Sequence, residues 1–409
     1  MASTDQLERN LRLYPWYAFT LESLFWAPVF ILLFSGLFPI AQVLQLESIY
    51  YLTVVILEVP SGYLADKMGR RRMLLIAAIL LSLSYLIFFL GSPFTAFAFA
   101  KILMAAGFAF KSGTDASFFF DTHKALGREE EFGDAEAKVS SMNFRGAGAA
   151  ALIGGVVGMV DLAIPFVFSA ITAIIAFGMM SLCVEPTHSS ERSQDTFGRQ
   201  LIGVIERLAS ADLRWLLGVA ILSIVLVHIP YQVYQPYINL LLNEKSVSVS
   251  DQISPLVAGV HALVVMFIGS LVARKSMAIR RKLGLTRTFL CSTLIQNLII
   301  LPTAIFLHPI GVLLLAMRNA PKAMYMAPLS QAVNERIPTN LRATYLSCQS
   351  LSGRVAYAIL LGMLSMVIGE NQVDWTSLSR ISEFSFYAGM SGWVLLLLTA
   401  KFVRDKFPA

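Results

Sequence analysis

The sequence predicts an all-α membrane protein with twelve transmembrane helices arranged as two pseudo-symmetric six-helix bundles. Of the 409 residues, 56% are hydrophobic and only 14% are charged, and the mean hydropathy is +0.67. Soluble domains average about 25% charged residues. The apolar residues form long unbroken runs. Runs of about 20 residues cross a bilayer as a helix, whereas a membrane β-barrel would show short alternating segments.

The apolar runs predict twelve spans and a division of the chain in its middle. The spans cover residues 15–35, 46–64, 73–91, 95–120, 139–160, 162–184, 214–240, 252–273, 286–307, 309–333, 343–369 and 381–402. We expect an N-terminal bundle over residues 1–184, a cytoplasmic linker over 185–212 and a C-terminal bundle over 213–409. Near the end of this linker, residues 201–208 form an amphipathic segment that is expected to lie along the membrane face.

The basic residues outside the spans are distributed unequally between the two sides of the membrane. With the N-terminus inside, the loops and tails on that side carry 24 Lys and Arg residues, and the opposite side carries two. Cytoplasmic loops typically carry such an excess. We therefore expect a multi-pass protein of the inner (cytoplasmic) membrane with both termini in the cytoplasm. The net charge of +6 then reflects topology, and no nucleic-acid partner is expected.

Missing motifs exclude several classes of function. The sequence contains no GxxxxGK[ST] signature of an ATP-driven pump, no HExxH or GxSxG, and no Cys/His set with metal-ligand spacing. The three cysteines all fall within predicted spans, so no disulfide framework is implied. We expect no enzyme activity, no cofactor and no metal site. The expected partners are a small organic solute, protons and the lipid bilayer, and the chain is expected to be a monomer.

The loop after the second span carries the most specific motif. Residues 62–72 read Gly-Tyr-Leu-Ala-Asp-Lys-Met-Gly-Arg-Arg-Arg. They resemble the signature loop of the major facilitator superfamily, G-x-L-A-D-R-x-G-R-K/R, with Lys67 in place of the usual Arg. The span count and the central linker agree with this motif, so the resemblance covers the whole chain. It implies the major facilitator fold and secondary transport by alternating access.

The same loop also has a direct physical interpretation. Gly62 allows close helix contact, Gly69 allows a tight turn, and Asp66 can lie at the N-terminus of a neighbouring helix. The resemblance implies that this Asp latches the two bundles together on the cytoplasmic side. The preceding ILEVPSG segment resembles a subset of bacterial facilitators, many of which export drugs or metabolites. The expected latch consists of Glu58, Gly62, Asp66, Gly69 and Arg70.

Charged residues inside the spans indicate a polar pathway, because each costs about 2.5–3.5 kcal/mol near the bilayer centre. Eight charged residues of the predicted spans are candidates for this pathway, six basic and two acidic, with Glu58 assigned to the latch: Lys101, Lys111, Arg145, Arg318, Lys322 and Arg354, with Glu22 and Asp115. This excess of four positive charges favours an anionic solute. In the resembled fold, spans 1, 4, 7 and 10 line the central cavity and spans 5, 8 and 11 contribute. All eight residues fall on these spans.

The expected substrate cavity combines cations with histidine and aromatic rings: Lys111, Arg145, His228, Tyr231, Tyr234, Arg318, Lys322, Arg354 and Trp26. Glu22 and Asp115 are expected to couple transport to protons, since a desolvated carboxylate can bind and release a proton as the cavity alternates. Alternatively, Lys111 and Asp115 pair with each other on one helix face. Lys101 is expected to snorkel to the outer surface, and His261 to be a packed histidine.

Glycines and prolines predict how these helices pack and bend. The small residues of segment 146–158 allow span 5 to pack tightly against span 8 or another helix. Pro28, Pro230 and Pro321 predict bends in spans 1, 7 and 10.

The leading functional prediction is a proton-coupled secondary transporter that exports a drug or metabolite, acting as an antiporter. One alternative is the uptake or exchange of an anionic metabolite or a siderophore-like chelate, which the excess of buried cations would favour. A second alternative is a flippase-like facilitator that moves a lipid or another amphiphile.

Overall fold

The computed structural model describes residues 3–38, 40–91, 93–186, 195–244, 254–368 and 375–403. The α-helices are α1 Thr4–Leu21, α2 Phe30–Leu37, α3 Ile40–Met68, α4 Arg70–Leu90, α5 Phe94–Lys111, α6 Thr114–Ala125, α7 Phe132–Gly158, α8 Ile164–Leu182, α9 Phe197–Arg207, α10 Ala211–Glu244, α11 Ser254–Leu283, α12 Leu285–Ile305, α13 Pro309–Ala316, α14 Asn319–Asn334, α15 Arg342–Ile368 and α16 Trp375–Ala400. Two short 3₁₀ helices, η1 Glu129–Glu131 and η3 Thr339–Leu341, precede α7 and α15.

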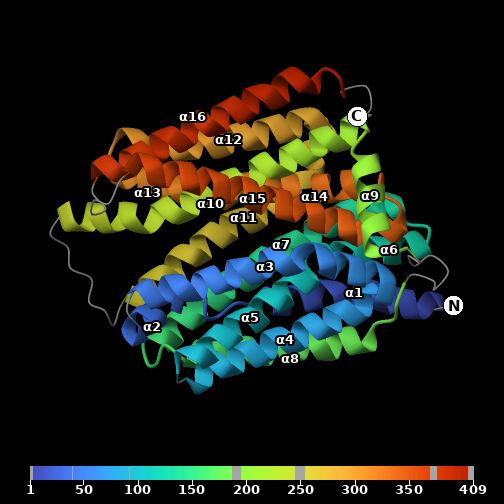
Figure 1. Ribbon diagram of the computed structural model, residues 1–409, viewed down its shortest axis with the longest axis horizontal. Helices are drawn as coiled ribbons and strands as arrows, with labels where there is room; N and C mark the ends of the chain where they lie inside the picture. The colour runs from blue at the N-terminus through green and yellow to red at the C-terminus, as the bar shows by residue number, and fades with distance from the viewer. Residues whose placement is uncertain are drawn as a thin grey trace.

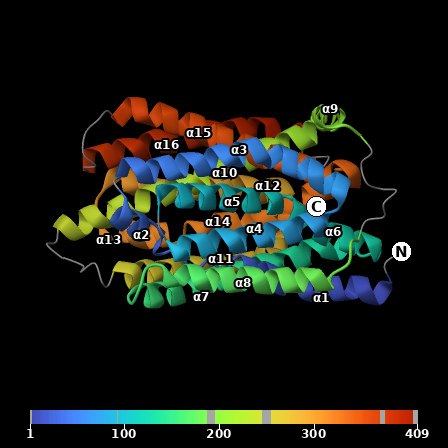
Figure 2. The same ribbon diagram turned by 60° about the horizontal axis from the view of Figure 1, so that its bottom comes forward.

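Most of the helices run along one long axis and form an elongated bundle (Figure 1). Helices α1–α8 gather in one group and α10–α16 in another, and the turned view in Figure 2 shows the same elongated arrangement. The start of α1 and the end of α16 lie at the same end of the bundle, which we call the terminal end. The two groups meet mainly where α7 packs on α11 and where α3 packs on α15.

The all-α prediction is confirmed, whereas the count of twelve spans is confirmed only in part. Among the described residues, eight helices are long and apolar enough to cross a membrane. Three of the predicted spans are each built from two consecutive helices, α1–α2, α5–α6 and α13–α14. These broken spans are the first, fourth and tenth, which the sequence assigned to the central cavity.

Each break lies beside charged residues. Glu22 is the C-cap of α1, Lys111 is the last residue of α5, and Arg318 is the N-cap of α14. Gly113 adopts the left-handed conformation, φ 70°, between α5 and α6, where a side chain would be strained. Broken membrane helices expose polar backbone ends inside the bundle and are typical of binding sites in transporters.

Prolines predicted these breaks only in part. The break in the first span begins at Glu22, before Pro28, and the fourth span breaks at a glycine without any proline. Helix α10 continues through Pro230. The breaks therefore follow the charged residues more closely than the prolines.

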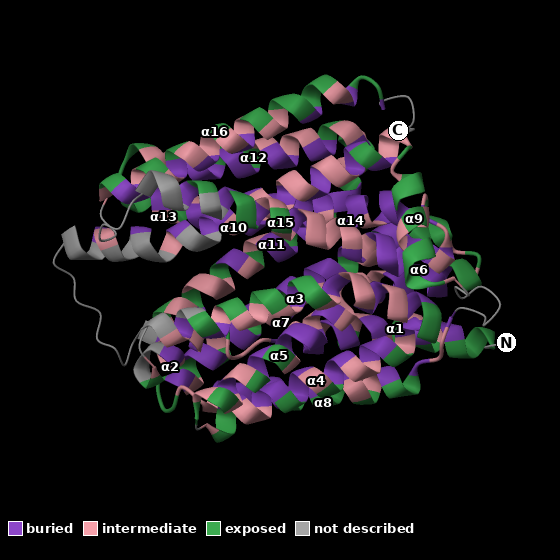
Figure 3. Ribbon diagram, viewed as in Figure 1, coloured by how far each residue is buried: buried purple, intermediate pink, exposed green. Residues whose placement is uncertain are grey.

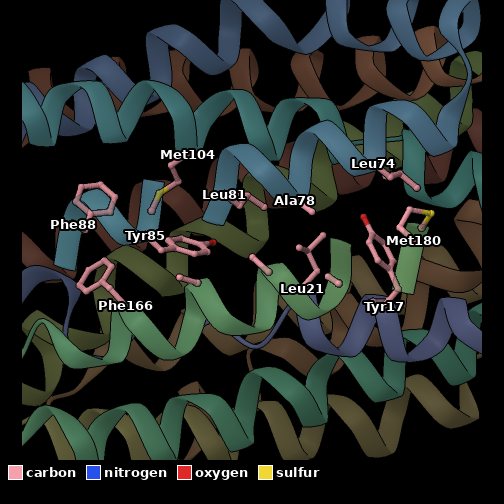
Figure 4. Packing of buried hydrophobic residues seen from close by; sticks show 14 of the residues in the cluster. Tyr17, Leu21, Leu74, Ala78, Leu81, Tyr85, Phe88, Met104, Phe166 and Met180 are labelled. Carbon is pink, nitrogen blue, oxygen red and sulfur yellow. The ribbon is translucent and has the colours of Figure 1, made fainter. Parts of the chain in front are cut away.

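The core of the first group packs α1, α4, α5 and α8 together through aromatic and aliphatic side chains (Figure 4). Tyr17 and Leu21 of α1 lie among buried side chains that include Leu74 of α4 and Met180 of α8. Within a membrane such helices are held together mainly by the van der Waals contacts of packed side chains. These contacts fix the end of α1 and thus the position of Glu22. Figure 3 shows that buried residues line the inside of the bundle and exposed ones its outer faces.

Glycines allow α7 and α11 to approach closely. A Cβ atom added to Gly155 would lie 2.5 Å from the carbonyl oxygen of Pro255 and 3.2 Å from the Cα atom of Gly259. A Cβ atom on Gly148 would lie 3.1 Å from the Cβ atom of Met266. The prediction that the small residues of the fifth span pack against the eighth is confirmed.

Candidate functional site

A network of charges from three helices lies at the breaks of the first and fourth spans. The Nζ atom of Lys111 donates a hydrogen bond to Oε1 of Glu22 and lies 3.9 Å from Oδ2 of Asp115. The side chain of Lys111 is 12% exposed, whereas those of Glu22 and Asp115 are 31% and 27% exposed. Both carboxylates are thus accessible to a small molecule or a proton carrier although they belong to the middle of long apolar segments.

The sequence left open whether Lys111 and Asp115 close on each other, and the structure gives Lys111 a different main partner. The closer contact of Lys111 is with Glu22, 89 residues earlier in the chain. The turn at Gly113 ends one helix and starts another, so Lys111 and Asp115 are not on one continuous helix face. Asp115 instead lies in the first turn of α6 and accepts a 2.8 Å hydrogen bond from the backbone N–H of Ala116.

Lys322 of α14 brings the second group of helices to this network. It interacts electrostatically with Glu22, which attracts it, and with Lys111, which repels it. Within the described part of the chain, its ammonium group makes no hydrogen bond or ion pair. The sequence placed both Lys111 and Lys322 in the expected substrate cavity. In the structure one is paired with a carboxylate and the other is not.

Glu136 is a member of the network that the sequence analysis missed. It belongs to α7, and it interacts electrostatically with Asp115 and Lys111. Its Oε2 atom is buried and has no hydrogen-bond partner among the described residues. The predicted fifth span began at residue 139, whereas α7 begins at Phe132, so an acidic residue just before the predicted boundary was assigned to a loop. Glu136 lies three residues before the predicted start of the span, so extending the helix by one turn would have included it.

A second cluster surrounds Arg318. Its Nη1 atom lies 2.8 Å from Nε2 of His261 and donates a 3.3 Å hydrogen bond to the carbonyl oxygen of Leu315. Its guanidinium carbon lies 4.4 Å from the centre of the Tyr234 ring, which stacks on His261 with ring centres 5.3 Å apart. Arg318 is 4% exposed. His261 was predicted to be a packed histidine, and it is packed, with Arg318 as its polar partner.

Two of the remaining predicted cations, Arg145 and Arg354, connect the two groups of helices. The Nε atom of Arg145 on α7 donates a 2.9 Å hydrogen bond to Oγ of Ser270 on α11. The Nη2 atom of Arg354 on α15 lies 3.7 Å from Oε2 of Glu58 on α3, and Oε1 of Glu58 accepts a 2.7 Å hydrogen bond from Ser112. Glu58 was expected in the latch, and its side chain instead contacts the break of the fourth span and α15.

His228 and Trp26 make their direct contacts outside the charge network, although His228 interacts electrostatically with Lys322 and Arg354. The Nδ1 atom of His228 bonds the carbonyl oxygen of Ile224 at 2.7 Å, one turn earlier on α10. Trp26 packs in the aromatic core, stacked 6.2 Å from Phe166. The side chain of Tyr231 lies outside the described residues.

The prediction that Lys101 snorkels to the surface is wrong. Lys101 is 2% exposed, and its ammonium group donates a 2.7 Å hydrogen bond to Oε1 of Glu47 on α3. The ammonium also lies 3.9 Å from the centre of the Phe30 ring. A carboxylate and an aromatic face compensate the buried charge, so the side chain has no need to reach water.

The predicted excess of four positive charges inside the bundle is also wrong. The count omitted Glu47 and Glu58, although both lie in the predicted span 46–64, and it omitted Glu136 because α7 begins before the predicted fifth span. Glu58 is fully buried. The six basic residues therefore face five acidic ones, which leaves an excess of one. The preference for an anionic solute that rested on this count is correspondingly weaker.

At the terminal end, Asp66 joins α3 to the first turn of α15. Its carboxylate accepts hydrogen bonds from the backbone N–H groups of Ala343 and Thr344, at 3.2 and 2.9 Å, and from the Thr344 hydroxyl at 2.9 Å. A Cβ atom on Gly62 would lie 2.7 Å from the carbonyl oxygen of Ala343. The expectations that Asp66 lies at a helix N-terminus and that Gly62 allows close helix contact are confirmed.

Arg70 extends this contact into a buried network. Its guanidinium lies 3.1 Å from Asp66 and 3.0 Å from Asp121 on α6, and it donates a 2.6 Å hydrogen bond to the carbonyl oxygen of Thr339. Asp121 also pairs with Arg342 at the start of α15. All four charged side chains are at most 3% exposed. Gly69, with φ 103°, provides the turn that places Arg70 beside Asp66. We call this set the terminal lock.

Helix α9 closes over the terminal lock. Its Gln200 is fully buried and donates a 3.1 Å hydrogen bond to the carbonyl oxygen of Asn340, and its Oε1 atom lies 2.7 Å from the Thr344 hydroxyl oxygen. The opposite side of α9 exposes Ile202 and Ile205. The segment predicted to be amphipathic thus has one face on the lock and an exposed apolar face.

Broken helices that gather charges inside an apolar bundle, together with a polar contact between two helix groups at one end, define a membrane transporter of small solutes. The chain belongs to the Major Facilitator Superfamily, whose sequence profile matches residues 39–361. It is therefore a multi-pass membrane protein with the fold that the sequence predicted.

Two solved structures share this fold. One is the transporter FucP of the Major Facilitator Superfamily in the outward conformation, with a TM-score of 0.67 and 14% identity over 95% of this chain and 99% of that chain. The other is a variant of the E. coli fucose:proton symporter FucP, with a TM-score of 0.65 and 14% identity over 94% of this chain and 98% of that chain. At this identity the likeness concerns the fold alone.

Among curated proteins, the chain is similar to Multidrug resistance protein 2 of Bacillus subtilis (strain 168). The two are 29% identical over 149 residues, which are 34% of this chain and 36% of the relative. The matched region thus spans about a third of that protein's length.

Proposed function

We propose that the chain exports a small organic solute in exchange for protons, by alternating access. The charges of Glu22, Lys111, Asp115, Glu136 and Lys322, which we call the central network, support the proposal. The carboxylates of Glu22, Asp115 and Glu136 face the ammonium groups of Lys111 and Lys322, so the fully ionised network carries one excess negative charge. Binding of one proton brings its charge to zero. A site surrounded by apolar segments is most stable when its charges balance.

Glu22 is the carboxylate through which a proton would change the geometry. In the ionised form it holds Lys111, since the two side chains are directly bonded. A proton on Glu22 removes that attraction and leaves Lys111 with Asp115, 3.9 Å away. Glu22 and Lys111 come from different broken spans, so the release loosens α1 relative to α5. A solute that contacts the same groups then competes with the proton, as exchange requires.

The terminal lock supplies the conformational part of the proposal. We propose that residues 1–184 and 213–409 move as two bundles joined by linker 185–212, and that the terminal end is cytoplasmic in an inner membrane. The lock joins the bundles there, so the structure corresponds to a state open to the opposite side. The similar fold of FucP in its outward conformation supports this assignment. Labelling of single cysteines at exposed Lys67 or Lys282 by an impermeant maleimide tests it. Protection in intact cells and labelling in lysed cells are expected.

Export and proton exchange have separate support. Export is favoured by the relative named as a multidrug resistance protein. Proton coupling has a precedent in the fold, since a structural neighbour is a fucose:proton symporter. The near balance of interior charges is compatible with a neutral or weakly charged solute.

The test is transport of ethidium and other organic dyes into or out of proteoliposomes, with and without a pH gradient. The unmodified protein is expected to move the dye against its concentration gradient only when a pH gradient is present. Glu22→Gln is expected to abolish this dependence. Asp134→Asn is the control and is expected to preserve it, because Asp134 forms an exposed ion pair with Arg281 outside the network. Gradient-dependent transport by Glu22→Gln would remove Glu22 from the coupling role. Gradient-independent transport by the unmodified protein would refute proton coupling.

Exchange of an organic anion is the second candidate, and the state of Lys322 favours it. This cation has no direct partner in the described part of the chain, and Arg318 lies four residues earlier on the adjoining break. A panel of organic anions, lipophilic cations and lipids in a thermal-shift assay distinguishes the candidates. Stabilisation by anions that is lost in Lys322→Ala but kept in the exposed-site control Lys275→Ala selects anion exchange. Stabilisation by lipophilic cations alone rejects it.

A further inference from the structure

A pocket of about 490 Å³ opens at the terminal end, away from the central network. Its lining comes from both groups of helices. Phe120 and Lys124 belong to α6, Arg207 ends the linker helix α9, and Asn334 and Arg342 belong to α14 and α15. Pockets of 300–1,000 Å³ are typical of small-molecule sites. A ligand in this one would touch both groups and the linker helix at once.

The lining is more basic than acidic, and its cations differ in how they are compensated. Arg336 is 3.0 Å from Asp212, and Arg342 is paired with Asp121. Lys124 donates only a 3.2 Å hydrogen bond to the Thr339 hydroxyl. For Lys124 and for Arg207, the described residues provide no carboxylate within ion-pair distance.

Compensation by the two acidic lining residues is incomplete. Glu335 is taken up by contacts with Gln331 and Arg336, at 2.6 and 3.8 Å. Glu129 is exposed at the rim, and no ion pair joins it to a cation in the described part of the chain. Of the four basic lining residues, Arg336 and Arg342 have carboxylate partners, whereas Lys124 and Arg207 line the pocket without one in the described part of the chain.

Two buried polar groups of the lining also lack partners. Asn334 is 0% exposed and Arg342 is 2% exposed, yet the Oδ1 atom of Asn334 and the Nε atom of Arg342 have no hydrogen-bond partner among the described residues. Unsatisfied buried groups of this kind are rare, and each requires an explanation such as a ligand or water. An acceptor and a donor beside the cations therefore lack partners.

An apolar surface completes the pocket. Phe120 lies under the guanidinium of Arg342, with the guanidinium carbon 4.3 Å from the ring centre. Ile337 and Pro338 line the same pocket. A ligand that matches this lining has an anionic group for the cations and a less polar part for the apolar side chains.

We infer that this pocket binds a phosphate-bearing organic anion, and that the bound ligand holds the terminal lock closed. A phosphate group suits Arg and Lys side chains in particular, because its oxygens accept several charge-assisted hydrogen bonds. The pocket joins both groups in the locked state, so a ligand that binds it best in that state shifts the population towards it. The site is distinct from the central network, and the inference does not depend on the transported solute.

Such a ligand has two possible sources, a soluble organic phosphate or a phospholipid head group. Adenosine 5′-monophosphate and inorganic pyrophosphate probe the first in detergent solution, by isothermal titration calorimetry. Nanodiscs that contain phosphatidate, compared with nanodiscs of phosphatidylcholine, probe the second by thermal shift. Binding of the soluble probes assigns a soluble ligand, and stabilisation by phosphatidate alone assigns a lipid.

The matched variants are Lys124→Gln with Arg207→Gln, and Arg199→Gln as control. Arg199 is an exposed cation on the same helix as Arg207 and does not line the pocket. The double variant is expected to weaken binding more than about tenfold, because it removes two charge-assisted contacts. Arg199→Gln is expected to leave it unchanged. If the double variant does not fold, Arg207→Gln alone, at an exposed position, replaces it. The inference is overturned if neither source binds, or if binding is equal in the pocket variant and the control.

Discussion

Replacement of Asp66 by Asn tests the terminal lock with little change in shape. The carboxylate accepts three hydrogen bonds from Ala343 and Thr344 and pairs with Arg70. The amide keeps one acceptor oxygen, but it loses the charge and turns an NH₂ group towards a donor. We expect the locked state to lose stability, while the open state, in which these bonds are absent, is unaffected.

The structure gives the magnitude of this loss. A hydrogen bond to a charged group contributes about 1.5–3 kcal/mol, and a negative charge at a helix N-terminus contributes about 0.3–1 kcal/mol more. A total of about 2–4 kcal/mol changes the ratio of locked to open molecules by about 30- to 1,000-fold. Asp134 provides the matched control, because it also pairs across the two groups, with Arg281 at 2.8 Å, but is 52% exposed. Loss of an exposed pair costs about 0.2–1 kcal/mol.

The assay measures the distance between spin labels on the two groups at the terminal end. Labels at Arg72 and Lys282, both exposed, in a background with the three cysteines replaced by serine, report the opening by pulsed electron paramagnetic resonance. Asp66→Asn is expected to populate a longer distance that is minor in the parent and in Asp134→Asn. An unchanged distribution in Asp66→Asn, or an equal change in both variants, would refute the assignment of the lock to Asp66.

Three further predictions concern packing and buried polar contacts, all measured by thermal or denaturant unfolding in detergent. Gly155→Ala is expected to destabilise the protein by about 1–3 kcal/mol through overpacking, whereas Gly178→Ala, with no atom within 4 Å of the new Cβ, is not; equal effects would contradict the close α7–α11 contact. Lys101→Met is expected to cost about 1.5–3 kcal/mol because Glu47, which is 34% exposed, loses its charge-assisted hydrogen bond, and additional Glu47→Gln is expected to recover much of this; no recovery would argue against the pair. Gln200→Ala is expected to cost about 1–3 kcal/mol by leaving polar groups of the lock unsatisfied, and an unchanged stability would show that α9 does not support the lock.

The fold and the lock were largely predictable because their signals are local. Apolar runs predicted the helices, and Asp66 between two glycines predicted a contact with the N-terminus of a neighbouring helix. These features depend on residues within one segment and on backbone geometry that any neighbouring helix can supply.

The partners of buried charges were not predictable, because they come from distant segments. Lys111 bonds to Glu22, 89 residues away, and Lys101 to Glu47, 54 residues away. Spacing in the sequence suggested only the local partner Asp115. Glu136 was missed because hydropathy marks where a helix enters apolar surroundings and not where the helix begins. Glu136 changed the count of interior charges for this reason, whereas Glu47 and Glu58 lay inside the second predicted span and were left out of that count. The inference about the solute changed with the count.

The helix ends explain why two carboxylates that the sequence treated alike have different roles in the proposed exchange. Asp115 lies in the first turn of α6, where the partial positive charge of the helix end and the N–H of Ala116 stabilise its anion. Glu22 caps the opposite, carboxyl end of α1, where the partial charge is negative and opposes an anion. The negative charge of Glu22 therefore depends on Lys111, its bonded partner. Any motion that separates α1 from the end of α5 leaves Glu22 with an unfavourable charge, which uptake of a proton removes. The Ala116 N–H and the helix end that support the Asp115 anion move with it on α6. We therefore propose Asp115 as the fixed anion of the exchange and Glu22 as the carboxylate that binds and releases the proton.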